Sequence, residues 1–332
     1  MIHDEALDAL IQRADLDGLV RLVDDRTASR DWSGLRSVRD RCRAAVATGR
    51  QLWPAATLAE FRLALVAPPD WAAPMIADDA GLFTIGPLTE VIAQHHSWAE
   101  LQPLLPATPG AAVVAHERVL RGEHLEASSV GGLPNVFDLP YELAPWEPAY
   151  PLATYSDDGV DAPPPDPPTQ FDSRSHGGRA AERLDDNTFE LAVRQLVETW
   201  TASSNGRADV VCVEGTADDA VAALGLSTWT SWQLTLAEAL AVLAWAGASG
   251  GAHGRRRGAA LGRFGALWVL AALVDVIDEW PVSLDDLGHR ARRLRWSWWE
   301  PAMSAAHGWR VQLAVEDPDD GHAWSISAVD AA

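Results

Sequence analysis

Glycine recurs at helical spacing between Trp245 and Trp268, and this pattern restricts most strongly how the chain can fold. The glycines concerned are separated by 4, 3, 4, 4 and 3 positions: Gly247, Gly251, Gly254, Gly258, Gly262 and Gly265. In a helix that turns by roughly 100° per residue they would share one face. Each glycine inside a helix costs about 1 kcal/mol relative to alanine. We therefore expect another element, or a ligand, to approach the backbone closely along this face.

A second interpretation of this stretch stays open, in which the helix breaks between Ser249 and Gly254 and a new helix starts near Arg255. A loop and a helix N-terminus would present backbone N–H groups beside several guanidinium groups, a combination that favours anions. The candidate ligand-binding residues are then Ser249, Gly250, Gly251, His253, Gly254, Arg255, Arg256, Arg257 and Arg263. The structural alternative is a tight corner between two helices, whose arginines pair with the protein's own carboxylates.

The same stretch contains the sequence Gly247-Ala-Ser-Gly-Gly251, which matches the G-x-S-x-G pattern of a nucleophilic serine. That pattern requires a strand before the serine, whereas the run from Leu236 to Trp245 is typical of a helix. A serine hydrolase is therefore only a minor variant of the functional hypotheses. Ser249 and His253 are candidate catalytic residues on this view.

Glu214 is a third catalytic candidate, because it ends the most strand-like run of the chain. The structural alternative is that Thr216 and Asp219, just after it, cap the helix that follows. His116 and His124 are eight residues apart rather than four, so they do not form a helical metal motif. We expect no metal and no cofactor.

The balance of charged residues restricts the class of partner. The chain has 47 acidic and 26 basic residues, which gives a net charge of −21 at pH 7. Nucleic acids and anionic membrane surfaces attract clustered cations, so we expect neither as a partner. An acidic surface favours a basic protein partner. Every basic residue is an arginine, which excludes chemistry that needs a lysine, such as a Schiff base or a P-loop.

The sequence shows no sign of export or of a membrane span. The N-terminus lacks a basic region followed by an apolar run, as a secretory signal would require. The apolar run from Leu261 to Ile277 is short and contains Arg263 and Asp275. Two cysteines, Cys42 and Cys212, cannot make a disulfide framework. We expect a cytoplasmic protein.

Residues 1–155 are expected to form a helical module. Asp15 and Asp31 can cap helices, and Trp53-Pro54 can open another. Residues 16–26 align with residues 32–42 at an offset of 16. This similarity resembles the helical hairpins of repeat arrays, which usually bind proteins. An ordinary helical bundle is the alternative.

A proline-rich and glycine-rich stretch at residues 156–187 predicts a linker to a second domain, residues 188–332. Helices are expected in this domain together with strands at residues 209–214, 295–299, 309–315 and 323–328, the last two joined by a hairpin turn at 317–321. The fold class expected is mainly α, with an N-terminal helical repeat-like module and a C-terminal α+β domain with a small antiparallel sheet. Sixteen tryptophans are expected in cores and interfaces.

Three stretches carry a resemblance to a family of proteins: residues Trp245–Trp268, Trp309–Pro318 and Ala323–Asp330. They resemble an uncharacterised family from high-GC Gram-positive (actinobacterial) genomes. The resemblance implies a bacterial and cytoplasmic origin. It implies no activity, so no catalytic residue can be transferred.

Two functional hypotheses from different classes follow. The first is a non-enzymatic protein-interaction or accessory factor of a bacterial cytoplasmic multi-protein system, with a protein partner, a second copy of the chain, or both. The alternative is an enzyme or sensor that binds an anionic small molecule, such as a nucleotide, phosphate or carboxylate, at the Gly/Arg-rich stretch 247–265.

Overall fold

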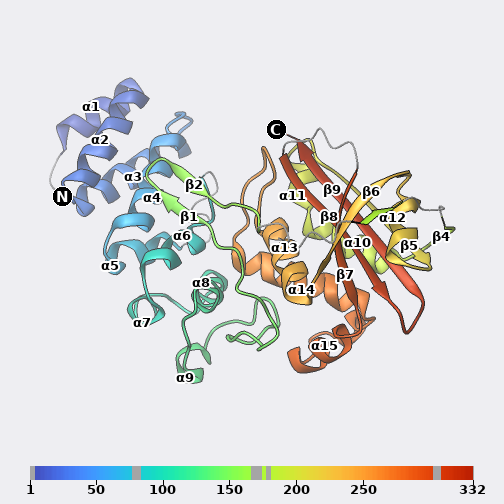
Figure 1. Ribbon diagram of the computed structural model, residues 1–332. Coiled ribbons are helices and arrows are strands. Elements are labelled where there is room, and N and C mark those ends of the chain that lie inside the picture. Colours follow the sequence, from blue (N-terminus) through green and yellow to red (C-terminus); the bar gives the residue numbers. More distant parts are fainter. Residues whose placement is uncertain (1–3, 77–83, 166–173, 177–180, 302–307, 332) are drawn as a thin grey trace. The chain divides into compact units, whose positions relative to one another are not determined.

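The computed structural model describes residues 4–76, 84–165, 174–176, 181–301 and 308–331 (Figure 1). The chain divides into two compact units. Unit 1 contains residues 1–136 and 153–161, and unit 2 contains residues 137–152 and 162–332. Helices dominate the N-terminal part and an antiparallel sheet lies in the C-terminal part, as the sequence predicts.

Unit 1 begins with four helices at the predicted places. They are α1 (Glu5–Arg13), α2 (Leu16–Ala28), α3 (Trp32–Ala47) and α4 (Trp53–Val66). Shorter helical segments follow: α5 (Pro69–Ala72), η1 (Ala73–Met75), α6 (Leu88–His95), α7 (Trp98–Leu101), α8 (Pro109–Leu120) and α9 (Ala127–Val130). A two-stranded hairpin of β1 (Thr154–Ser156) and β2 (Gly159–Asp161) completes the unit.

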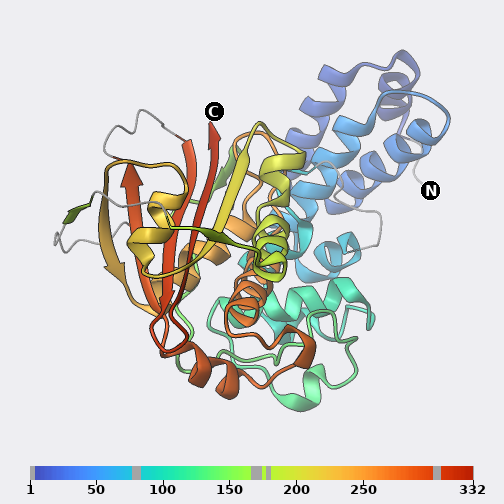
Figure 2. The same cartoon turned by 90° about the vertical axis from the view of Figure 1, so that its right-hand side faces the viewer.

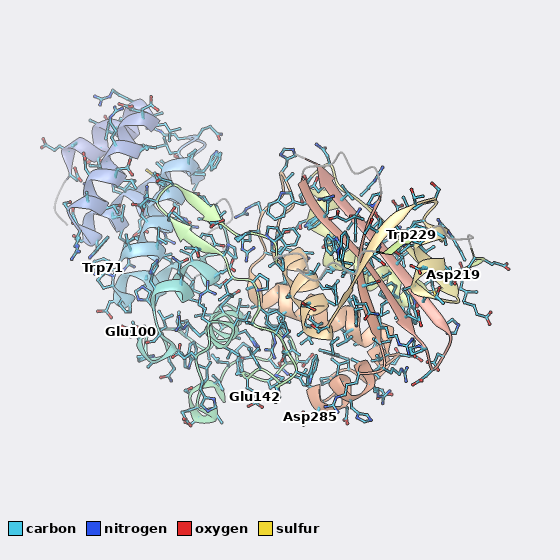
Figure 3. All side chains as sticks on the ribbon, in the orientation of Figure 1. Trp71, Glu100, Glu142, Asp219, Trp229 and Asp285 are labelled. Atoms are coloured by element: carbon cyan, nitrogen blue, oxygen red, sulfur yellow. The ribbon has the colours of Figure 1, made fainter. Side chains whose placement is uncertain are left out.

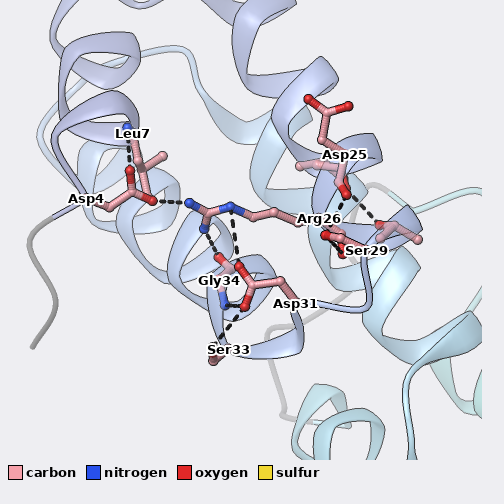
Figure 4. A network of polar contacts seen from close by, with 10 residues as sticks. Asp4, Leu7, Asp25, Arg26, Ser29, Asp31, Ser33 and Gly34 are labelled. Atoms are coloured by element: carbon pink, nitrogen blue, oxygen red, sulfur yellow. Dashed lines mark hydrogen bonds and ion pairs between the residues drawn. The ribbon is translucent and has the colours of Figure 1, made fainter.

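The sequence similarity at an offset of 16 corresponds to two helix starts of the same design. Asp15 accepts a hydrogen bond from the amide of Gly18, and Asp31 accepts one from the amide of Gly34. A Cβ atom on Gly34 would collide with the Asp31 carboxylate, so any other residue there would displace the capping side chain. Arg26, in the last turn of α2, donates to the carbonyl of Gly34 and pairs with Asp4, which connects the end of α2 to the starts of α1 and α3 (Figure 4).

Arginine also connects the third and fourth helices. The buried Glu60 of α4 accepts from Arg39 and Arg43 of α3, at Nε to Oε1 distances of 3.0 and 2.6 Å. The hairpin β1–β2 is held to α6 because the Gln94 side chain bonds both backbone groups of Tyr155. The Tyr155 hydroxyl donates to Glu90 at 2.6 Å. The hairpin therefore belongs to unit 1 rather than to the predicted linker.

Unit 2 is built around a seven-stranded sheet in the order β3-β6-β7-β8-β9-β5-β4, with antiparallel pairing throughout. The strands are β3 (Arg174–His176), β4 (Arg183–Leu184), β5 (Arg207–Glu214), β6 (Trp229–Leu234), β7 (Arg295–Pro301), β8 (Gly308–Asp317) and β9 (His322–Ala331). The sheet is larger than expected, since β3, β4 and β6 have no counterpart among the predicted strands. The hairpin of β8 and β9 is present as predicted.

Helices cover both faces of this sheet (Figures 1 and 2). Helix α12 (Ala217–Ala223), which contains Asp219, packs on one face against Trp229; Figure 3 labels both residues. The other face carries α10 (Asn187–Leu196), α11 (Glu198–Ala202) and α13 (Leu236–Ala248). Helix α14 (Ala259–Leu273) packs on α13 and α10, followed by η2 (Ile277–Glu279) and α15 (Leu284–Ala291).

Several tryptophans form the core of unit 2, in agreement with the expected role for these residues. Trp200, Trp229 and Trp299 are fully buried. Trp245 stacks on Trp309 with ring centroids 5.0 Å apart, and Trp200 meets both rings edge-on. No helix within the described part of the chain has the length and apolar character needed to cross a membrane.

The irregular segment 137–152 packs in unit 2, which changes the predicted boundary at residue 155. The Trp146 indole donates to the carbonyl of Leu284 at 3.0 Å, and Phe137 stacks on Phe264 of α14. Of the predicted linker 156–187, residues 166–173 and 177–180 lie outside the described residues. The two units thus exchange segments along the sequence instead of being joined by one linker.

Candidate functional site

The glycine stretch forms a helical hairpin of α13 and α14 joined by a loop at residues 249–258. The structure thus agrees with the second interpretation of the sequence, in which a loop separates two helices. The second helix, α14, starts at Ala259, four residues later than expected. Close approach of the two helices explains two of the glycines. A Cβ atom on Gly262 would collide with the carbonyl oxygen of Ala244 and lie 2.9 Å from Cβ of Ala248. A Cβ atom on Gly247 would lie 3.3 Å from Cα of Gly262.

The loop is closed by its own backbone. The amides of Arg257 and Gly258 both donate to the carbonyl of Ala248, at 2.7 and 3.3 Å. Gly250 and Gly254 approach each other so closely that a Cβ atom on either would collide with backbone of the other. Gly251 has a φ of 69°, and the next amide, of Ala252, donates to the buried Asp330 at 2.6 Å. These amides bond to carbonyl and carboxylate oxygens of the protein itself. They therefore stabilise the loop and are not available to an external anion.

Ser249 has a structural position in this loop. It is 1% exposed and follows helix α13 rather than a strand. Its hydroxyl accepts from the Trp200 indole at 2.9 Å and donates to the carbonyl of Ala246 at 3.1 Å. Both interactions fix the end of α13, and the geometry of a nucleophile on a strand-to-helix turn is not formed.

The other two catalytic candidates lie at the surface. His253 is exposed, and its amide donates to Ser204 at 3.1 Å. Glu214 is exposed at the end of β5, in register with His322 of β9. Thr216 and Asp219 form a capping box for α12, which is the structural alternative weighed for this region. Among the residues described, no hydrogen bond joins Ser249, His253 and Glu214.

Arg263 forms a buried ion pair within unit 2. Its Nε and Nη2 atoms each lie 2.8 Å from an oxygen of Glu147, and the two side chains are 1% and 0% exposed. Nη2 also donates to the carbonyl of Glu142, which Figure 3 labels, at 2.7 Å. The Tyr150 hydroxyl donates to Glu147 at 2.6 Å; burial, then the charge of Glu147, raise the pKa of Tyr150. This guanidinium holds segment 137–152 on α14.

Arg257 has a different environment, at the wall of a cavity between α10 and α14 that is partly open and measures about 320 Å³ with the solvent at its mouth included. It is partly buried, and its Nη1 atom donates to the carbonyl of Gln195 at 3.0 Å. Burial lowers the pKa of Arg257, while Glu198 acts in the opposite direction. No described carboxylate lies close enough to Arg257 to form an ion pair. The neighbours Arg255, exposed, and Arg256, partly buried, do not line this cavity.

Apart from Gln195 and two glycines, apolar residues make the rest of the cavity wall. Leu261, Phe264 and Trp268 follow one face of α14 and Leu196 comes from α10. Trp268 and Phe264 stack with ring centroids 5.9 Å apart. Leu191, one turn before Gln195 on α10, is 56% exposed.

These wall residues are missing from the sequence-based candidates. The spacing of Leu261, Phe264 and Trp268 could have indicated a common helix face. The sequence near these residues gives no sign that they pack against α10, which comes some 70 positions earlier. Only the fold brings the two helices together. Within the described residues, no group of three or more His, Cys, Asp or Glu side chains is arranged to hold a metal ion.

The chain belongs to DUF6183, a family of unknown function, whose match covers residues 17–332. Comparison with curated proteins and with solved structures finds no match.

Proposed function

We propose that the protein is a non-enzymatic interaction factor, an accessory component of a multi-protein system in the cytoplasm of actinobacteria. The observation that supports this best is the apolar surface of unit 2 around the cavity between α10 and α14. Leu191, Leu261, Phe264 and Trp268 all keep solvent-accessible surface there. Large aromatic residues at the edge of a cavity are typical anchors of protein interfaces.

The helical unit 1 offers a second surface for a partner. Its arginines Arg26, Arg39 and Arg43 are used in ion pairs between its own helices. With a net charge of −21 for the whole chain, a partner with a basic surface would be attracted over long range. The cavity then provides specificity at short range.

The test is the assembly state of the purified full chain and of its complexes captured from the native host. We expect a stable assembly in size-exclusion chromatography with light scattering. The double substitution Leu191→Ser and Leu261→Gln should weaken it by at least about 10-fold in affinity, because it places polar groups in an apolar interface. Leu184→Ser, at an exposed leucine of β4, is the matched control. A strictly monomeric chain that captures no partner would count against the proposal.

A second function is favoured by Arg257 in the cavity wall: an enzyme or sensor that binds an anionic small molecule. A guanidinium beside apolar walls suits a carboxylate or phosphate on an apolar body. Thermal-shift measurements with nucleotides, phosphates and acyl carboxylates test this function. A ligand that raises the melting temperature of the parent chain but not of Arg257→Gln would support it. No shift with any of these compounds would contradict it.

A further inference from the structure

We infer that the cavity between α10 and α14 binds the C-terminal residue of a partner protein, with an apolar side chain in the cavity and the terminal carboxylate on Arg257. This inference rests on the proposed interaction function. It assigns a binding site to this chain and specifies the chemistry of the partner segment that occupies this site.

The first argument is the state of the Arg257 guanidinium. Arg263, six residues further on, has two hydrogen bonds to a carboxylate and two to carbonyl groups. Arg257 makes one hydrogen bond, from Nη1 to the carbonyl of Gln195, and forms no ion pair with the described residues. That bond orients the planar group while other N–H donors stay available. A carboxylate would supply the missing counter-charge with bidentate geometry.

The second argument is the composition of the walls. Leu196, Leu261, Phe264 and Trp268 are apolar, Gly247 and Gly265 add bare backbone, and besides Arg257 the one polar residue among the described residues of the wall is Gln195. The triphosphate group of a nucleoside triphosphate would lose its hydration against such walls without compensation. A ligand with one carboxylate and one apolar body matches both parts of the cavity.

The third argument is size. The hollow of about 320 Å³ includes open solvent at its mouth, so its enclosed part is smaller than the roughly 300–1,000 Å³ of typical ligand sites. A space of that kind suits one side chain with its carboxylate at the open mouth, and it is too small for a row of side chains from a docked helix. Capture of a terminal carboxylate is an established mode of peptide recognition. Leu191, exposed one turn before Gln195 on α10, provides apolar contact for the residues that precede the terminus.

The test uses the full chain and three probes in isothermal titration calorimetry. The probes are the peptide acetyl-Gly-Gly-Ala-Phe with a free carboxylate, the same peptide as its C-terminal amide, and 3-phenylpropionate. We expect the free peptide to bind at least about 10-fold more tightly than the amide. Arg257→Gln should abolish this preference. Leu261→Phe, which fills the cavity without changing charge, should weaken both peptides.

Arg194→Gln is the matched control, because Arg194 is exposed on α10 and pairs with Glu190 of the same helix; it should leave all affinities unchanged. Circular dichroism melting identifies any variant that fails to fold. If either Arg257→Gln or Leu261→Phe fails to fold, the other one tests the inference. Equal binding of peptide acid and amide, or an unchanged preference in Arg257→Gln, would overturn the inference. So would 3-phenylpropionate binding as tightly as the peptide, which would indicate a site for free acids.

The assembly experiment separates this inference from the function on which it rests. If the peptides fail but the chain still assembles with a partner, only the assignment of the cavity is lost. If neither peptides bind nor assemblies form, the proposed function fails as well.

Discussion

Arg263 and Glu147 show how a buried ion pair acts at the scale of one residue. Both side chains are excluded from water, so removal of either leaves the other charge buried without a partner. We expect Glu147→Met and Arg263→Met each to lower the free energy of unfolding by about 3–5 kcal/mol. Urea denaturation measures this. The double variant Glu147→Met with Arg263→Met should lose less than the sum of the two single changes.

Arg194→Gln, which removes an exposed pair with Glu190, should cost no more than about 1 kcal/mol. Additive losses in the Glu147 and Arg263 double variant would show that the two residues do not act as a pair.

His96 provides a prediction about pH. Burial lowers the pKa of His96 from its ordinary value of 6.5, with a smaller opposing effect from Glu100. Well above pH 6.5 the ring is neutral in both the folded and the unfolded chain. As the pH falls below 6.5 the unfolded chain takes up the proton first, so stability decreases with falling pH. We expect His96→Asn to reduce the loss of stability between about pH 7.5 and about pH 5.5, measured by urea denaturation. An unchanged pH dependence in this variant would contradict the prediction.

Residue-level features were predictable where their partners are close in sequence. Asp15 and Asp31 cap helices through amides three residues later, and the capping box of Thr216 and Asp219 is equally local. Arg263 illustrates the opposite case. Its partner lies 116 residues earlier, and the sequence around Arg263 contains nothing that selects Glu147 among 47 acidic residues.

At the scale of elements, the crossing of α13 and α14 depends on one glycine more than on its neighbours. A Cβ atom on Gly262 would collide with backbone of α13, which cannot move cheaply. We expect Gly262→Ala to destabilise unit 2 by about 1–3 kcal/mol. Gly265→Ala is the control, since its Cβ would meet only the end of the Leu196 side chain, at 2.7 Å.

That control should be neutral or stabilising, by up to about 1 kcal/mol, because alanine favours the helix. Thermal unfolding followed by circular dichroism compares the two variants. Equal melting temperatures would show that close packing of the helices does not explain the glycine at position 262.

The elements differed in how well the sequence predicted them. Helices α1 to α4 and the strands β5, β8 and β9 have clear periodicity or β-branched composition and were predictable. Strand β6 was not, because Trp229-Thr-Ser-Trp-Gln-Leu234 mixes aromatic and polar residues on both faces. The cavity between α10 and α14 was not predictable either, since it exists only after two separate helices pack together.

At the scale of the whole molecule, the exchange of segments predicts which fragments can fold. A cut at the predicted boundary would remove residues 137–152 from unit 2 and leave Arg263 buried without Glu147. We expect fragment 137–332 to unfold cooperatively in urea and fragment 162–332 to show no cooperative transition. Circular dichroism and denaturation of both fragments check this. Equal stability of the two fragments would show that segment 137–152 is dispensable.

The separation of Glu147 from Arg263 also has a consequence for synthesis on the ribosome. Glu147 is translated 116 residues before Arg263, which at roughly 5–20 residues per second is a delay of about 6–23 s. Residues 153–161, which complete unit 1, are translated well before that delay ends. The nascent chain can therefore finish its first unit while the intervening segment, with Phe137 and Trp146, waits in water for the helix on which it will lie. Until then Phe137 and Trp146 lack the residues Phe264 and Leu284 against which they pack in the folded chain.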